Sequence, residues 1–265
     1  MRVVVTGGGG AGMGAAAVRM LVEQGAEVHV LDFKEPPVEV ASHQAADLAD
    51  REAIEAAAAA IPGSIDALFN CAGVAGSRFS DLDTVLINFV GVRHLTDLLV
   101  PRMPAGSAVA TIASAAGATW PQQLQKALPL VQTEGFAEGR AWCEEHLGEF
   151  EHSYVVSKEA ICIWTQHACV DLGAKGIRIN CTMPGPTRTP LSPAFDEATG
   201  KEFWENFPIP VGRHAEPEEQ AQALLFLNSR AASCITGVPL PDGGTISGAT
   251  VGSIPPEAFP ALPGH

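Results

Sequence analysis

The sequence is poor in basic residues and in long apolar runs. Lysine and arginine number 16 against 30 aspartates and glutamates, which gives a formal net charge of −14. This charge repels polyanions, so nucleic acids and acidic membrane surfaces are poor partners. No apolar stretch reaches the roughly 18 residues of a membrane span, and MRVVVTGG at the start lacks the features of a signal peptide. We therefore expect a soluble, cytoplasmic protein whose partners are neutral or apolar small molecules or other proteins.

Paired cysteine motifs are absent as well. The six cysteines, at positions 71, 143, 162, 169, 181 and 234, form no CxxC pair and have no histidine at zinc spacing. We therefore expect reduced, buried thiols and no bound metal.

Short β-branched runs alternate with helical patterns along the 265 residues. This alternation predicts one α/β domain over 1–265, a doubly wound parallel sheet of the Rossmann type with helices on both faces. The expected strands are 3–5, 27–32, 65–73, 107–114 and 177–185, and the expected helices are about 12–24, 50–60, 84–100, 154–173 and 216–228. Ligands bind such sheets beyond the carboxyl ends of the strands, so functional residues should follow strands.

Two segments interrupt the alternation. Residues 119–149 have helical spacing but contain Pro129 and Gly135, which predicts a helical insertion. Residues 245–265 are proline-rich, and we expect an extended tail that either lies on a neighbour's surface or is disordered.

The stretch VTGGGGAGMG at 5–14 places six glycines among the eight residues from Gly7 to Gly14. An apolar strand precedes it and a helical pattern follows, which favours a dinucleotide-binding loop over a flexible linker. Glycine permits the tight turn, and the helix amino end offers N–H groups and a positive dipole to a pyrophosphate. The consensus fits in two registers, as GxGxxG from Gly7 and as GxGxxA from Gly10.

An acid follows the second predicted strand, where VHVLDF places Asp32 before Phe33. A dinucleotide-binding unit uses an acid at this position to bind the ribose 2′-hydroxyl. The carboxylate repels the 2′-phosphate of NADP, and no basic residue lies in the glycine loop, so the sequence favours NAD. Lys34 is expected to be a solvated surface lysine.

The chain has one tyrosine, Tyr154, and Lys158 follows it by one helical turn. Residues at i and i+4 share a helix face, so the ammonium can lower the phenol pKa from about 10 and make the tyrosine an acid and base. The alternative is a tyrosine that caps the core and a lysine at the surface.

As an ordered set, these motifs resemble the short-chain dehydrogenase/reductase family, and within it the bacterial 3α-hydroxysteroid and coniferyl-alcohol dehydrogenases. The set comprises the glycine loop, Asp32, NCAG at 70–73, Asn88 in INFVG, Ser114, Tyr154, Lys158, PGPTRT at 184–189 and the terminal PDGG. The resemblance implies that Tyr154 donates and accepts the proton, that Ser114 hydrogen-bonds the substrate oxygen, and that Lys158 lowers the tyrosine pKa and binds the nicotinamide ribose. It also implies that Asn88 holds a water molecule that leads protons to the lysine.

The resemblance further implies cofactor contacts from the strand ends and the glycine loop. They are Gly8, Gly12, Met13, Gly14, Asp32, Phe33, Asp47, Leu48, Asn70, Ala72, Gly73, Tyr154, Lys158, Pro184, Gly185, Thr187 and Thr189. Counting back from Asp32 puts the first loop glycine of the family's TGxxxGxG pattern at Gly8. Gly7 then takes the place of a bracing threonine or serine, and we expect Gly7→Thr to tighten NAD binding or raise thermal stability.

These roles imply an NAD(H)-dependent alcohol dehydrogenase or carbonyl reductase, in which hydride passes between the cofactor and an alcohol carbon while Tyr154 handles the hydroxyl proton. The alternatives are a catalytically silent NAD-binding sensor or scaffold, and a dehydratase or epimerase on the same fold.

Two departures from the family pattern bear on assembly and substrate. Thirty-nine residues separate Ser114 from Tyr154, and this insertion should obstruct a four-helix subunit interface, so we expect a homodimer instead of a tetramer. Aromatic residues gather in the insertion and in a predicted substrate lid at 186–212, which suits a steroid, terpene or phenylpropanoid alcohol or ketone. Ordinary packing of the lid against the body is the alternative. The aromatic residues are Trp120, Trp142, Phe195, Phe203, Trp204 and Phe207.

Overall fold

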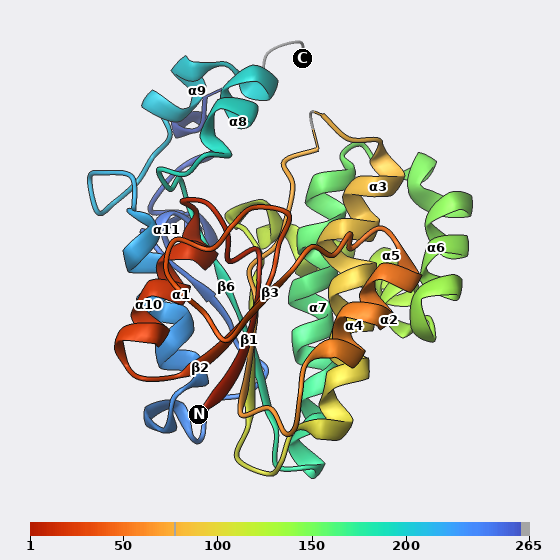
Figure 1. The fold of residues 1–265 in the computed structure, drawn as a ribbon. Helices are drawn as coiled ribbons and strands as arrows, with labels where there is room; N and C mark the ends of the chain where they lie inside the picture. The colour runs from red at the N-terminus through yellow and green to blue at the C-terminus, as the bar shows by residue number, and fades with distance from the viewer. Residues whose placement is uncertain (77, 261–265) are drawn as a thin grey trace.

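A seven-stranded parallel sheet forms the centre of the computed structural model, which describes residues 1–76 and 78–260 (Figure 1). In sheet order the strands are β3 (Ser42–Gln44), β2 (Glu27–Leu31), β1 (Arg2–Thr6), β4 (Ala67–Asn70), β5 (Ala108–Ile112), β6 (Arg178–Met183) and β7 (Pro239–Pro241). Successive strands add to one edge of the sheet from β1 to β3 and to the other edge from β4 to β7, so the strand order switches between β1 and β4, as in a doubly wound fold. The predicted fold class and all five predicted strands are confirmed.

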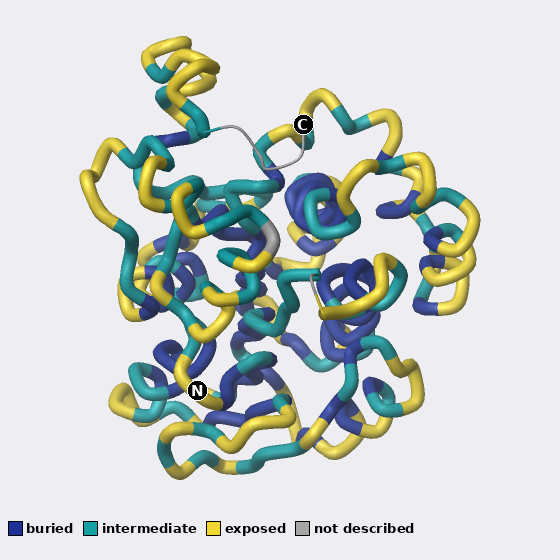
Figure 2. The backbone as a smooth tube through the Cα atoms, turned by 90° about the horizontal axis from the view of Figure 1, so that it is seen from above, coloured by how far each residue is buried: buried dark blue, intermediate teal, exposed yellow. Residues whose placement is uncertain are grey.

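Alternate residues of the strands face two helical layers. Val3 and Val5 of β1 pack toward α1 (Met13–Glu23) and α10 (Pro217–Asn228), and Val4 packs in the opposite core. The helices of that second layer are α2 (Arg51–Ala60), α4 (Gly91–Leu99) and α7 (Ser153–Ala174). Both faces of the strands are apolar because each packs against a helical layer. Complete burial of such a valine stabilises the fold by about 1.5–3 kcal/mol. From above, the buried segments gather around the sheet and exposed segments form the rim (Figure 2).

The helix that leads into α4 has an irregular turn. It begins as α3 (Asp81–Val85), with Ser80 capping its amino end, and passes through a π-helical turn at Leu86–Val90 before α4. Such turns recur at functional positions because the extra residue redirects side chains. Asn88 lies in this turn.

The predicted insertion is helical, as expected. It forms α5 (Trp120–Gln132) and α6 (Gly135–His146), which cover α7 and α4 on their outer side (Figure 1). Gly135 has a positive φ of 67° at the break between the two helices, a conformation that glycine adopts without strain. The helix N-terminal to the break includes Pro129.

The lid and the tail fold together, and the prediction of an extended tail is wrong for its described part. The lid contains α8 (Ser192–Thr199) and α9 (Lys201–Glu205), and the tail forms α11 (Thr245–Thr250). Beyond α11, Phe259 packs against Phe207 of the lid with ring centroids 5.6 Å apart. Residues 261–265 lie outside the described part of the chain. The remaining short turns are 3₁₀ segments at Val100–Arg102, Ala115–Thr119, Leu147–Glu149, Arg230–Ala232 and Pro256–Ala258.

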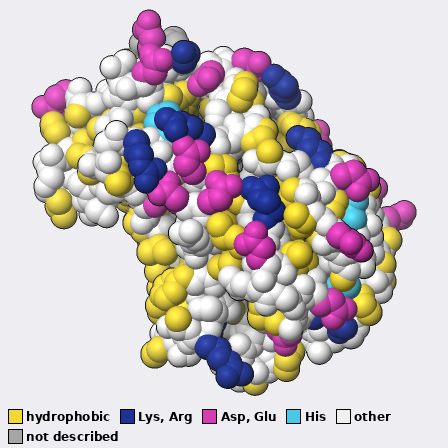
Figure 3. All heavy atoms as spheres, turned by 60° about the vertical axis from the view of Figure 1, so that its left-hand side comes forward, with side chains coloured by type: hydrophobic (Ala, Val, Ile, Leu, Met, Phe, Trp, Pro, Cys, Tyr) yellow, Lys and Arg dark blue, Asp and Glu magenta, His cyan; other side chains and the backbone are white. Residues whose placement is uncertain are grey.

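Two surface properties complete the fold. None of the described helices combines the length and the apolar character that a membrane crossing requires. On the face that carries α1 and α10, basic side chains are scattered among acidic ones (Figure 3), and Arg19 and Arg213 pair with Glu218 and Glu219.

Candidate active site

Ser114, Tyr154 and Lys158 meet at the carboxyl edge of the sheet. Ser114 follows β5, and Tyr154 and Lys158 lie in the first turns of α7. The Lys158 ammonium lies 5.6 Å from the centre of the Tyr154 ring and donates a hydrogen bond of 3.1 Å to the carbonyl of Ile112, the last residue of β5. Lys158 is 4% exposed. The alternative of a surface lysine is therefore wrong.

The Ser114 segment is fixed from two sides. Its hydroxyl accepts a hydrogen bond of 3.1 Å from the amide of Ala116, and the Ala115 amide donates to the carbonyl of Pro184. A Cβ atom on Gly117 would lie 2.8 Å from the Lys158 carbonyl oxygen, so this glycine lets the serine turn approach α7. Sequence-distant segments thus hold the serine hydroxyl beside the tyrosine.

The pKa of Tyr154 shifts in the direction opposite to the one that the sequence predicts. Burial raises the pKa of Tyr154 from 10.0 to about 12, and the Ser114 hydroxyl offsets this only in part. Burial also lowers the pKa of Lys158 from 10.5 to about 8. Desolvation is thus the largest cause of both pKa shifts, and the tyrosine is protonated near neutral pH.

Asn88 connects α7 to the segment that follows β4. Its amide oxygen accepts from the Val74 amide at 2.8 Å, and its nitrogen donates to the Val74 carbonyl and to the Ser157 hydroxyl at 3.0 and 3.1 Å. A Cβ atom on Gly73 would lie 3.2 Å from the Asn88 oxygen and 3.5 Å from the Lys158 ammonium. The structure thus brings Asn88, Gly73 and Lys158 together, and the water-holding role stays a prediction.

The glycine loop has a different register from the one expected at its amino end. Thr6 ends β1, and its hydroxyl accepts hydrogen bonds of 3.1 Å from the amides of both Cys71 and Ala72. Gly7 has a φ of 66°, and a Cβ atom there would lie 2.6 Å from the backbone of Ala72. Thr6 is therefore the bracing residue, and Gly7 is the first loop glycine.

This register overturns two expectations. Gly8 is buried, and a Cβ atom there would meet Val18 and Val30, so Gly8 packs in the interior instead of opening the loop. A Gly7→Thr substitution would strain the backbone and collide with Ala72, so the expected gain in binding or stability is wrong. The loop is one residue longer than the family pattern.

The longer loop is held by the turn after β2. Asp32 accepts hydrogen bonds of 2.9 Å from the amides of Gly9 and Lys34, one at each carboxylate oxygen. A Cβ atom on Gly9 would lie 2.1 Å from the Lys34 carbonyl oxygen. Asp32 therefore shapes the loop as well as placing a carboxylate at the predicted cofactor position. Phe33 beside it is 69% exposed.

The amino end of α1 suits a pyrophosphate. Its first helical hydrogen bond runs from the Ala16 amide to the carbonyl of Gly12, so the amides of Met13 and Gly14 have no helical acceptor. A Cβ atom on Gly14 would lie 2.2 Å from the Gly7 carbonyl oxygen. Only glycine fits there, and the residues present fit a dinucleotide cofactor.

The other predicted cofactor residues divide into two groups. Ala72 and Gly73 follow β4 beside the loop, and Asp47 and Leu48 follow β3, as expected. Asn70 is 1% exposed and donates to the hydroxyls of Thr96 and Thr111, so its side chain fixes the sheet instead of reaching a cofactor. The segment from Pro184 to Thr189 follows β6, as predicted.

The aromatic residues of the lid reach Tyr154. Phe195 packs edge-on against Tyr154 with ring centroids 5.4 Å apart, and Trp204 packs against Phe195 at 5.9 Å. Phe203 and Phe207 continue the cluster to Phe259 of the tail. Phe259 was not predicted, because an aromatic residue in a proline-rich tail has no local signal.

The two insertion tryptophans lie elsewhere. Trp142 stacks on His146 at 4.7 Å and contacts Phe150, both near the end of the insertion. Trp120 is partly buried against the large core at the start of α5. Neither tryptophan shares an aromatic contact with the lid among the described residues, and their place in a substrate pocket stays a prediction.

Comparison with known proteins decides the family. Residues 2–125 match the model described as short chain dehydrogenase, and residues 140–245 match that described as enoyl-(acyl carrier protein) reductase. Coniferyl-alcohol dehydrogenase of Pseudomonas sp. (strain HR199 / DSM 7063) is 32% identical, over 93% of this chain and 96% of that protein. The chain belongs to the short-chain dehydrogenase/reductase family. It is thus an oxidoreductase of a family that binds nicotinamide cofactors.

Further members agree with the predicted group. The 3α-hydroxysteroid dehydrogenase/carbonyl reductase of Comamonas testosteroni is 31% identical, over 92% of this chain and 96% of that protein. The crystal structure of 3α-hydroxysteroid dehydrogenase from Pseudomonas sp. B-0831 with NADH has a TM-score of 0.78 and 29% identity, over 94% and 98% of the two chains. The structure of BdcA with NADPH has a TM-score of 0.69 and 25% identity, over 100% and 96% of the chains. Both cofactors therefore occur among the solved structures that this chain resembles.

Proposed function

We propose that this short-chain dehydrogenase interconverts a hydrophobic alcohol and its carbonyl compound with NAD(H), using Tyr154 as acid and base. The observation that carries the proposal is the meeting of Ser114, Tyr154 and Lys158 beside the glycine loop. The nicotinamide cofactor, when bound, supplies or accepts the hydride.

The proton chemistry belongs to the side chains. During reduction, Tyr154 donates its hydroxyl proton to the carbonyl oxygen of the substrate, and Ser114 offers a second hydroxyl to that oxygen. During oxidation, Tyr154 must first lose its own proton, which burial opposes, and the phenolate then takes the proton of the alcohol. Lys158 holds a positive charge near the ring below pH 8 or so and favours the phenolate once the proton has left.

NAD is the proposed cofactor because Asp32 follows β2, where dinucleotide-binding units use an acid to bind the ribose 2′-hydroxyl, and its carboxylate would repel a 2′-phosphate. The test compares kcat/KM for NAD and NADP in the wild type and in Asp32→Asn. Asparagine keeps an acceptor for one of the two loop amides and loses the charge, so the preference for NAD should fall at least about tenfold. A wild-type preference for NADP would contradict the assignment.

The proposed substrate is a ring-bearing alcohol. The lid offers aromatic edges next to Tyr154, and the relatives include enzymes named for coniferyl alcohol and for 3α-hydroxysteroids. We expect NADH formation with cyclohexanol, an aromatic alcohol or a hydroxysteroid to exceed that with propan-2-ol. Phe195→Ala and Phe259→Ala should raise KM for the preferred cyclic alcohol and leave propan-2-ol unchanged.

Two outcomes of this panel would contradict the substrate assignment. A preference for propan-2-ol would show that the aromatic cluster only packs the lid. NAD binding without turnover of any alcohol or ketone would favour a sensor or scaffold that has kept the fold.

A further inference from the structure

We propose that Asp242 and Gln220 are positioning residues that fix the segment from Pro184 to Thr189 against the nicotinamide end of the cofactor. This inference rests on the proposed function, because that segment is assigned to the cofactor there. The motif PDGG at 241–244 contains Asp242, for which the sequence alone indicates no role.

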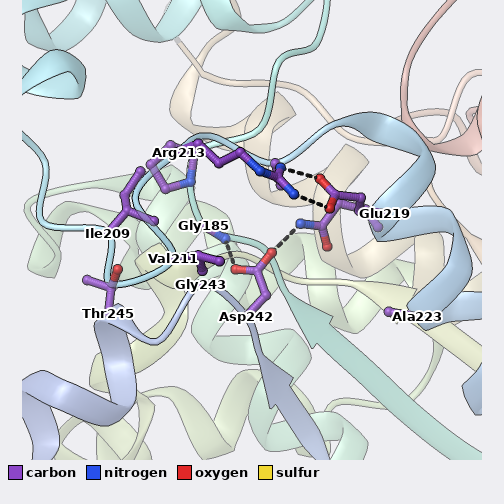
Figure 4. A pocket seen from close by; sticks show the side chains of 12 residues that line it. Gly185, Ile209, Val211, Arg213, Glu219, Ala223, Asp242, Gly243 and Thr245 are labelled. Carbon is purple, nitrogen blue, oxygen red and sulfur yellow. Dashed lines mark hydrogen bonds and ion pairs between the residues drawn. The ribbon is translucent and has the colours of Figure 1, made fainter.

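The segment needs anchors from outside because it has few amides of its own. Positions 184 and 186 are prolines, which have no N–H group. The Arg188 amide donates to the Ala215 carbonyl and the Thr189 amide donates to the Ser192 hydroxyl. Gly185 lies between two prolines, and its amide donates to a carboxylate oxygen of Asp242 at 2.6 Å (Figure 4).

Gln220 links Asp242 and Thr187 in a hydrogen-bond network around this contact. Its side-chain nitrogen donates to the second carboxylate oxygen of Asp242 and lies 3.4 Å from the Thr187 hydroxyl. The Thr187 hydroxyl in turn donates to the Gly185 carbonyl at 3.0 Å. Gln220 is 3% exposed, and buried hydrogen bonds to a charged group are among the strong ones.

Asp242 and Gln220 are themselves held in place by regular secondary structure. Asp242 follows β7, which pairs in parallel with β6 through Met183 and Pro241. Gln220 lies in the first turns of α10, where Glu216 and Glu219 form a reciprocal cap. The ends of a strand and a helix thus define where Gly185 lies.

A cavity makes these anchors necessary. It has a volume of about 160 Å³ and is lined by Gly185, Pro186, Gln220 and Asp242, together with residues of the lid end such as Ile209 and Val211 (Figure 4). Close packing does not hold the segment on this side, so hydrogen bonds must. Loss of the carboxylate would let the segment shift toward the cavity and away from the nicotinamide.

The test measures binding by titration calorimetry with two probes, NADH and ADP-ribose, which lacks the nicotinamide. Asp242→Ala should raise the Kd for NADH about tenfold and change the Kd for ADP-ribose by less than about twofold. Asp242→Asn should recover most of the NADH affinity, because the amide oxygen can still accept from Gly185. Asp66→Ala is the matched control, since Asp66 accepts the backbone amide of Arg2 at the amino end of β1, at the edge of the sheet opposite this segment.

Each other outcome has a defined meaning. Equal losses for NADH and ADP-ribose, or unchanged NADH binding in Asp242→Ala, would overturn the positioning role and leave the proposed function intact. A wild type that binds neither NADH nor NADPH would overturn the proposed function and this inference with it.

Discussion

At the scale of single residues, the protein buries a charge where the reaction needs it. Burial lowers the pKa of Lys158 from 10.5 to about 8. At pH 7 the lysine is charged in the folded and the unfolded state, and the folded state bears a cost of about 3 kcal/mol. Between about pH 8 and 10.5 the folded protein loses this proton first, so its stability rises and the cost disappears above 10.5.

Lys158→Met should therefore raise the free energy of unfolding of the ligand-free protein at pH 7 by about 1–3 kcal/mol, with loss of the hydrogen bond to Ile112 reducing the gain. The difference from wild type should shrink as the pH rises from 8 toward 10.5. Urea unfolding at several pH values measures it, with the exposed Lys175→Met as control. A less stable Lys158→Met at pH 7 would contradict this electrostatic account.

The glycine loop gives a second residue-scale prediction. Gly7→Ala places a Cβ atom against Ala72 at a positive φ, and should cost about 1–3 kcal/mol of stability. Gly173→Ala is the matched control, because a Cβ atom there meets nothing within 4 Å in α7 and alanine favours a helix. Urea unfolding should show opposite signs for the two variants. Equal effects would restore the register in which Gly8 begins the loop.

Residues differ in how far sequence can predict them. Tyr154 and Lys158 were predictable because their spacing is local to one helix and their order with Ser114 is a family pattern. The roles of Thr6 and Asn70 were not, because they depend on Ala72 and Thr96, which only the fold brings close. The direction of the pKa shift of Tyr154 was not predictable either, because burial in the folded protein decides it.

At the scale of elements, length and periodicity decided what could be predicted. The long strands and helices were found, but β3 and β7 have three residues each, too few for an alternating pattern, and β7 begins and ends in proline. The helix α11 was missed because the proline-rich composition beyond it masked its short helical run.

A buried arginine adds hydrogen bonds to the apolar packing between the insertion and the body. Arg93 of α4 is 3% exposed and donates to the carbonyls of Leu130, Val131 and Gly135 and to the Thr133 hydroxyl, at 2.8–3.1 Å. It thereby satisfies the open carbonyl end of α5 and the start of α6. Burial lowers the pKa of Arg93, and the Asp97 charge partly offsets this.

Arg93→Met should cost about 3 kcal/mol or more, because it removes four hydrogen bonds that a buried guanidinium donates to the insertion. Arg140→Ala is the control: it removes an exposed pair with Glu144 within α6 and should change stability by less than about 0.5 kcal/mol. Urea unfolding compares them. Similar small losses for both variants would show that apolar packing alone holds the insertion.

At the scale of the whole molecule, the sheet order and the two apolar layers follow from the alternation of strands and helices, and this could be predicted. How copies assemble could only be inferred from the insertion. Because α5 and α6 cover the outer side of α4 and α7, those helices are not free to form a four-helix contact with another copy. Static light scattering should give the mass of two chains, and a mass of four chains would contradict the obstruction.

The central claim is that Tyr154 moves the substrate proton in a nicotinamide-dependent alcohol dehydrogenase. The most direct measurement is the rate of NADH formation from the best cyclic alcohol of the panel, for wild type and Tyr154→Phe, with NADH affinity measured in parallel. Phenylalanine keeps the ring and its contact with Phe195, so NADH affinity should stay within about twofold, and kcat should fall at least about 100-fold. A Tyr154→Phe protein as active as wild type would contradict the account.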